Sequence, residues 1–88
     1  PEGYSLQQNY PNPFNPSTTI TFGIPTAGHS TLRVYNSVGQ CVAELLNETV
    51  EAGSYSIKFD AGQLSSGLYF YRFTSGTYTD IKRMTLVQ

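Results

Sequence analysis

The chain has 88 residues, of which 39% are hydrophobic, 14% aromatic and 12% charged, and its formal net charge is −1. This length corresponds to one domain, and few charges beside many aromatic rings exclude intrinsic disorder. The near-neutral charge excludes a general electrostatic footprint for nucleic acid or an anionic membrane. A single cysteine, Cys41, excludes an intrachain disulfide and a cysteine-based metal cluster. No apolar run approaches the roughly 20 residues that cross a bilayer, and a first residue other than Met predicts a fragment or a processed product.

Apolar and polar residues alternate along almost the whole chain, which is the pattern of half-buried β-strands. The alternation predicts strands at residues 18–24, 31–35, 40–46, 55–59, 68–73 and 78–87. Gly39 predicts a tight turn after the second of these, because glycine readily adopts a positive φ. Residues 68–73 are apolar on both faces, which predicts a central strand. Six or seven short strands predict an all-β fold, a single antiparallel immunoglobulin-like β-sandwich.

The same alternation predicts which side chains form the core and where the sandwich begins. The expected core residues of the first, third and last strands are Ile20, Phe22, Ile24, Val42, Met84 and Leu86. We expect one domain over residues 1–88, in which a proline-rich strap at residues 1–16 precedes a β-sandwich at residues 17–88.

Residues with reactive side chains are few and isolated. His29 lies in an expected turn and lacks the acid and nucleophile that a catalytic histidine needs, so we expect a solvated loop residue. Cys41 begins a strand without a basic neighbour, and we expect it to be buried or half-buried. Asp60 is expected to cap the turn that follows it, and neither Asp60 nor Asp80 lies in a calcium-loop motif. There is no phosphate-binding loop or paired-glutamate motif, so we expect no enzyme, no cofactor and no metal.

Seven tyrosines allow two interpretations. Four of them, on expected strands, could form an aromatic platform for carbohydrate: Tyr35, Tyr69, Tyr71 and Tyr78. In the other interpretation the strand aromatics form the core and their hydroxyl groups reach its rim. We favour the second, because so small a core needs these rings. A carbohydrate-binding or adhesive immunoglobulin-like module nevertheless remains the alternative function.

The segment before the first long strand is the most distinctive part of the sequence. Its residues are Tyr10, Pro11, Asn12, Pro13, Phe14, Asn15 and Pro16. Prolines remove backbone donors and hold the chain extended, and they restrict the residues before them. Asn12 and Asn15 favour turns in which their side chains bond to the backbone, which leaves Tyr10 and Phe14 as apolar anchors. The segment therefore predicts a stiff strap that fixes where an upstream domain ends.

Five segments together carry a resemblance to a known family. They are N-Y-P-N-P-F-N-P-S-T-T-I at 9–20 followed by F-x-I-P, L-R-V-Y-N-S-V-G-Q at 32–40, A-G-S-Y-S-I-K-F-D at 52–60, L-S-S-G-L-Y-F-Y-R-F at 64–73 and K-R-M-T-L-V at 82–87. In this order and at this spacing the chain resembles the type A C-terminal sorting domain of the type IX (Por) secretion system. The resemblance covers nearly the whole chain.

The resemblance implies a non-catalytic sorting signal attached to an upstream cargo domain. The cargo of such domains crosses the inner membrane by a signal peptide and folds in the periplasm. The outer-membrane translocon then recognises the sorting domain, and in many cargoes a sortase-like cell-surface peptidase removes it. The cargo is released or joined to anionic lipopolysaccharide at the cell surface. We expect this chain to be a monomer with no nucleic acid partner and no transmembrane segment, and cleavage to fall before Tyr4 or further upstream.

The family's signal lies largely in its last strands. By resemblance these map to Gly67, Leu68, Tyr69, Lys82, Arg83, Met84, Thr85, Leu86 and Val87. The family usually closes with a lysine, whereas this chain ends in Gln88. The pair Lys82–Arg83 has two interpretations: a handle for electrostatic recognition and edge pairing, or a guard against aggregation of an edge strand. A third function, a structural spacer similar to the immunoglobulin-like domain of the flagellar hook-cap protein, shares parts of the pattern.

Overall fold

The computed structural model describes residues 1–88 and contains seven strands and no helix. The strands are β1 (Ser5–Leu6), β2 (Ser17–Ile24), β3 (Gly28–Asn36), β4 (Cys41–Val50), β5 (Gly53–Asp60), β6 (Gly67–Ser75) and β7 (Tyr78–Leu86). All six predicted strands are present, and β1 is an additional one within the expected strap. The sheet therefore begins at Ser5, earlier than the alternation alone indicates.

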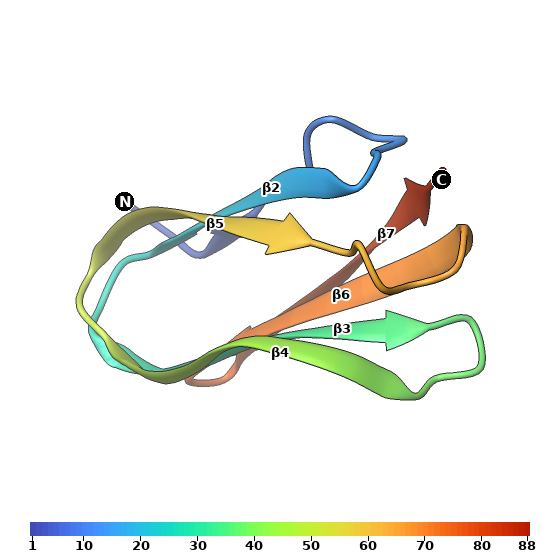
Figure 1. Ribbon diagram of the computed structural model, residues 1–88. Helices are drawn as coiled ribbons and strands as arrows, with labels where there is room; N and C mark the ends of the chain where they lie inside the picture. The colour runs from blue at the N-terminus through green and yellow to red at the C-terminus, as the bar shows by residue number, and fades with distance from the viewer.

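Two antiparallel sheets pack face to face as a sandwich (Figure 1). One sheet has the order β1-β2-β5 and the other the order β4-β3-β6-β7. β6 lies between β3 and β7, which confirms that residues 68–73 form a central strand. Between the sheets lies a single core of buried side chains: Leu6, Phe14, Ile20, Phe22, Ile24, Leu32, Val34, Phe59, Ala61, Tyr69, Tyr71, Phe73, Met84 and Leu86. The predicted all-β immunoglobulin-like sandwich is confirmed.

β3 and β4 are longer than the apolar pattern predicts. β3 begins at Gly28 and β4 continues to Val50, and their added residues pair with each other. Ser30 is fully buried there and donates a hydrogen bond to Ser75 Oγ at 2.9 Å. The alternation of apolar and polar residues does not indicate a buried pair of hydroxyl groups, so it did not predict these added residues. His29 is therefore an exposed strand residue that contacts Asn47 Oδ1 at 2.8 Å, and the predicted loop position is wrong.

The predictions for the start of β4 are wrong in part. Two register shifts against β3 leave extra residues on β4, and one of them is Val42. A bulge of this kind resets which side chains point inward. Val42 is consequently half-buried at the edge of the core. Cys41 is exposed, although we expected it to be buried or half-buried.

The molecule is elongated, with principal extents of 37 × 23 × 16 Å, and its two chain ends lie at opposite ends of the sandwich (Figure 1). The C-terminus lies beside the proline-rich segment, at the same end as the 36–40 turn. The structure contains no helix that could cross a membrane.

The turn between β3 and β4 gives a first testable prediction. Gly39 has a φ of +88°, and its N–H donates to Asn36 O at 3.0 Å. We expect Gly39→Ala to lower the free energy of unfolding by about 1 kcal/mol, because a Cβ disfavours this backbone conformation. Urea denaturation checks this. Gly3→Ala is the control, since an added Cβ meets nothing within 4 Å there; equal effects at both sites would contradict the prediction.

Candidate functional site

The segments singled out in the sequence meet at one end of the sandwich. β6 and β7 pair so that Gly67 lies opposite Leu86, and Tyr69 opposite Met84. Phe14 forms an isolated parallel bridge with Leu86. In Figure 1 the blue loop that carries the prolines lies next to the end of β7. Residues far apart in the sequence thus form one continuous region, which we take as the candidate recognition site.

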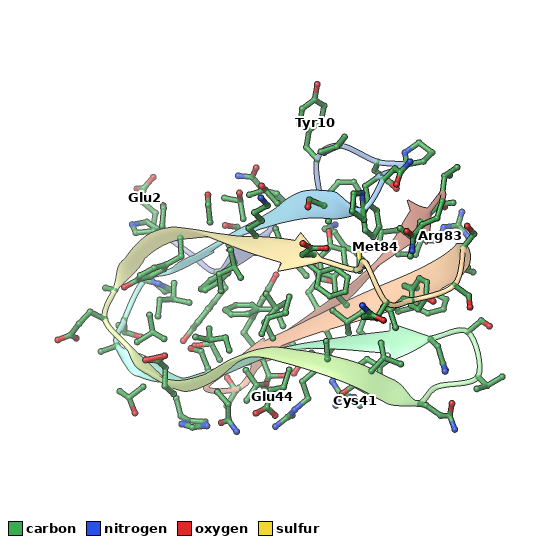
Figure 2. All side chains as sticks on the ribbon, viewed as in Figure 1. Glu2, Tyr10, Cys41, Glu44, Arg83 and Met84 are labelled. Carbon is green, nitrogen blue, oxygen red and sulfur yellow. The ribbon has the colours of Figure 1, made fainter.

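The proline-rich segment is a closed loop rather than an extended strap. It consists of bends, and its ends are joined by two hydrogen bonds between the backbones of Tyr10 and Thr19, both 3.0 Å. Phe14 is only 2% exposed, which confirms it as an anchor. Tyr10 is 81% exposed and projects away from the molecule (Figure 2), so its prediction as an anchor is wrong.

Asn9 holds this loop in shape from inside. Its side-chain Nδ2 donates to Pro11 O at 3.1 Å and to Thr18 Oγ1 at 3.0 Å, and Thr18 Oγ1 donates to Pro11 O at 2.8 Å. Asn9 and Thr18 are each 2% exposed, yet the structure has no buried side-chain polar atom without a partner. Sequence reasoning expected Asn12 and Asn15 to shape this loop and missed Asn9. The clue that could have found it is an asparagine directly before the tyrosine–proline pair.

Residues 8–14, which we call the clasp, pair with the outer edge of β7. Gln8 Nε2 donates to Arg83 O at 2.7 Å, and Thr85 N donates to Asn12 Oδ1 at 3.0 Å. Phe14 N donates to Thr85 O at 2.9 Å, and its carbonyl accepts from Val87 N at 2.9 Å. An edge strand otherwise presents such groups unpaired. The clasp thus completes the hydrogen bonding of β7 over the residues predicted to carry the signal.

Tyr71 fixes the start of the clasp from the central strand β6. Its hydroxyl donates to Gln7 O at 2.7 Å and accepts from Asn9 N at 2.8 Å. Burial raises the pKa of Tyr71 to about 12, the bond from Asn9 N partly offsets this, and the charge of Asp80 adds to it. The alternation placed Tyr71 in a strand, but its distant backbone partners are set by tertiary structure alone.

The predicted signal residues divide into buried and exposed sets. Met84 and Leu86 are each 1% exposed, which confirms their expected core positions. Tyr69 is 6% exposed and donates its hydroxyl to Ser65 O at 2.7 Å. Gly67 has a φ of +153°, and nothing lies within 4 Å of an added Cβ. The exposed or half-exposed side chains, which a partner can contact, are those of Leu68, Lys82, Arg83, Thr85 and Val87.

Gln88 holds the end of the chain against the loop between β5 and β6. Its backbone N–H donates to Ser66 Oγ at 2.8 Å. Its side-chain Nε2 donates to Ala61 O at 3.4 Å and also to Leu64 O. Leu64 is half-buried and packs against the core, so it fills the space under that loop. Gln88 therefore joins the end of β7 to this loop.

The site is positively charged and lacks ion pairs. The only salt bridge of the structure joins Arg33 and Glu44 on β3 and β4, so Lys82 and Arg83 have no carboxylate partner. Asp80 accepts a hydrogen bond from the Tyr78 hydroxyl at 3.3 Å. Burial and the charge of Asp80 raise the pKa of Tyr78. The cations on this strand are thus available to an external partner.

The remaining candidates do not form a chemical site. Asp60 Oδ1 accepts from Gly62 N at 3.0 Å, which confirms it as a turn cap. No group of three histidine, cysteine, aspartate or glutamate side chains is placed to hold a metal ion. Of the proposed carbohydrate platform, Tyr69 and Tyr71 are buried in the core, and Tyr78 stacks on Tyr4 with ring centroids 4.9 Å apart. Tyr69 and Tyr71 thus belong to the core, as we favoured, whereas Tyr35 is half-buried and lies outside it.

The two aromatic residues of the proline loop provide a matched pair of variants. We expect Phe14→Ala to lower the free energy of unfolding by about 3–5 kcal/mol, because it leaves a cavity beneath the clasp. Tyr10→Ala should change it by less than about 0.5 kcal/mol, because the ring is exposed. Urea denaturation of both variants measures the difference. A loss at Tyr10 as large as that at Phe14 would contradict the assignment of the anchor.

Tyr71 predicts loss of stability at high pH. In an unfolded chain a tyrosine has a pKa of about 10, whereas burial raises that of Tyr71 to about 12. The unfolded state therefore releases the proton first, so the contribution is complete below about pH 10 and disappears as the pH rises through about 12. Tyr71→Phe should lower stability at neutral pH by about 1–3 kcal/mol, because two backbone groups lose their partner. Tyr71→Phe should also reduce the decrease in the free energy of unfolding between about pH 10 and about pH 12. Urea denaturation at several pH values measures this, and the same pH dependence in both proteins would contradict the prediction.

Comparison with known proteins identifies the family. The sequence pattern of the family described as the secretion system C-terminal sorting domain matches residues 8–87. Among solved structures, the fold is similar to part of PorZ from Porphyromonas gingivalis, described as an essential bacterial surface component of the type IX secretion system. The TM-score is 0.66 at 16% identity, and the match covers 99% of this chain and 12% of that one. No curated protein sequence matches. PorZ supports the fold, and the match over residues 8–87 shows that the chain belongs to the family of type IX secretion C-terminal sorting domains.

Proposed function

We propose that this sorting domain is recognised by the outer-membrane translocon through the exposed side chains beside the clasp. These are the exposed side chains of Leu68, Arg83, Thr85 and Val87, together with the half-buried Lys82. The observation that carries the proposal is the convergence of the proline loop with the start of β6 and the end of β7. The buried members of the motifs, Met84 and Leu86 among them, hold this surface in place.

The partners of the proposed function are an upstream cargo in the same chain, the translocon and a sortase-like peptidase of the cell surface. The cargo passes through the periplasm and is delivered to the cell surface or released. The domain, residues 1–88, acts as a non-catalytic monomer. Its support is the family match.

Cleavage by the peptidase is proposed to fall before Tyr4 or further upstream. Residues 1–3 are exposed and precede the first strand, whereas Tyr4 is packed on Tyr78. An exposed terminal segment without sheet hydrogen bonds is accessible to a protease. Cutting there leaves the clasp intact.

An export assay tests the recognition surface. Residues 1–88 are fused behind a fluorescent reporter that carries a signal peptide, in a bacterium with a type IX system. Truncation before Lys82 would also remove buried core residues, so we choose substitutions of exposed side chains instead. We expect the triple variant Arg83→Ala, Thr85→Ala, Val87→Ala to lower the exported fraction about tenfold, as the loss of about 1.4 kcal/mol of binding free energy would.

The matched control lies on the outer face of the other sheet. It is the triple variant Thr19→Ala, Ser54→Ala, Lys58→Ala, which also replaces exposed residues and removes one positive charge. Urea denaturation of both purified domains establishes that they remain folded. Normal export of the first variant, or an equal loss in both, would contradict recognition at this surface.

A further inference from the structure

The two outer faces of the sandwich differ in their chemistry. On the three-stranded sheet the outward side chains of β2 and β5 are small or charged: Ser17, Thr19, Thr21, Ser54, Ser56, Lys58 and Asp60. The four-stranded sheet presents a group that we call the arginine–aromatic face: Tyr35, Leu68, Phe70, Arg72, Ile81 and Arg83. The solvated face of an antiparallel sheet is ordinarily polar. The formation of the sheet alone therefore does not explain why apolar and arginine side chains lie together on this outer face.

The register of the strands brings these side chains together. Phe70 lies between Tyr35 on β3 and Arg83 on β7, directly opposite each. In the next row Arg72 lies opposite Ile81, which is 55% exposed. The surface between the two rows is a hollow of about 420 Å³ lined by Tyr35, Gly39, Phe70, Arg72 and Ile81. Arg72 thus lines an apolar depression, and Arg83 lies next to it, opposite Phe70.

The position of Arg72 opposite another arginine lowers the stability of the sheet when no partner is bound. Arg33 lies directly opposite Arg72, and like charges in this position are destabilising. Arg33 is neutralised by Glu44, with Nε and Oε2 2.8 Å apart. Arg72 instead donates to Tyr35 Oη at 2.6 Å and stacks over that ring, 5.0 Å from its centroid. Neither Arg72 nor Arg83 forms an ion pair with a carboxylate in the structure.

We propose that the arginine–aromatic face binds an acidic surface of a protein of the export machinery. The partner's carboxylates pair with Arg72 and Arg83, and its apolar side chains enter the hollow beside Phe70 and Ile81. Guanidinium groups bind carboxylates through two parallel hydrogen bonds, and arginine and aromatic residues are enriched at protein interfaces. The inference rests on the proposed function, and it adds a second contact surface next to the clasp.

A protein fits this face better than a glycan or a lipid headgroup. Leu68, Phe70 and Ile81 offer apolar area, which the apolar side chains of a protein match and a phosphate does not. The Tyr35 ring, which a sugar would need for stacking, is covered by Arg72. Charge complementarity and apolar contact therefore point to the same class of partner.

Site-directed crosslinking tests the inference. The 88-residue chain with Cys41→Ser and Ile81→Cys is labelled with a benzophenone maleimide and mixed with solubilised outer membranes of a bacterium that has this secretion system. Ser56→Cys, on the opposite outer face, is the matched position. We expect one discrete protein adduct at position 81, with an aspartate- and glutamate-rich crosslinked peptide by mass spectrometry. Its yield at position 56 should be about tenfold lower.

Charge reversal provides the second measurement. Arg83→Glu should reduce the adduct about tenfold, because it places a carboxylate against the acidic partner. Lys58→Glu, the same change of charge on the other face, should leave the adduct unchanged. Lysine substitution of the partner's carboxylates should restore the adduct of the Arg83→Glu chain. Comparison of Arg83→Glu with Lys58→Glu thus distinguishes pairing of Arg83 with the partner from an effect of the net charge of the domain.

Three results would overturn the inference: equal yields at positions 81 and 56, an adduct that is lipopolysaccharide rather than protein, or equal effects of Arg83→Glu and Lys58→Glu. Export of the reporter fusion in the same bacterium shows whether the arginine–aromatic interface alone is wrong or the proposed function is wrong as well. Normal export with any of these results overturns the arginine–aromatic interface alone. A folded fusion that is not exported overturns both.

Discussion

The pairing of the clasp with the edge of β7 is the interaction on which the candidate recognition site of this domain depends. Asn12 and Thr85 are 73 residues apart in the chain, yet they share a hydrogen bond. Phe14 continues the pairing with backbone bonds on either side of Leu86 while its ring fills the core. The same few residues thereby join the two sheets, bury an aromatic ring and satisfy the outer edge of the last strand.

This arrangement explains why a proline-rich N-terminal motif and a C-terminal strand occur together in one domain. They are two halves of one structure, because the shape of the last strand's outer edge is determined by the loop that covers it. Tyr71 couples them again from the middle of the larger sheet, through its bonds to Gln7 and Asn9. A partner that contacts Arg83 and Thr85 therefore meets a surface that exists only when both ends of the chain have folded together.

Much of the fold was predictable because it follows from alternation and turn chemistry. Ile20, Phe22 and Ile24 define the inner face of β2, and Gly39 marks the hairpin turn between β3 and β4, and neither prediction needs knowledge of the partner strands. The errors arise where a residue's environment is set by distant segments. Cys41 is exposed because a bulge changes the alternation, and Tyr10 is exposed because its backbone pairing with Thr19 turns the ring outward.

The candidate site was predictable in its members but not in its geometry. The resemblance singled out the residues of the loop and of β7, but nothing local indicates that Phe14 meets Leu86. Asn9 was missed, and Tyr71 was expected only as an aromatic residue of the core, because their hydrogen bonds join residues that are distant in the sequence. The outer face of the larger sheet was equally hidden, since Tyr35, Phe70 and Arg83 become neighbours only through the register of three strands.

The positions of the two chain ends have a mechanical consequence for whatever the domain carries. A polypeptide joined ahead of Pro1 leaves from one end of a body 37 Å long, and Arg83 to Val87 lie at the other. On the proposed function, the length of the sandwich separates an upstream cargo from the surface that the translocon contacts. Cargoes of very different size can then be joined to the domain without covering that surface.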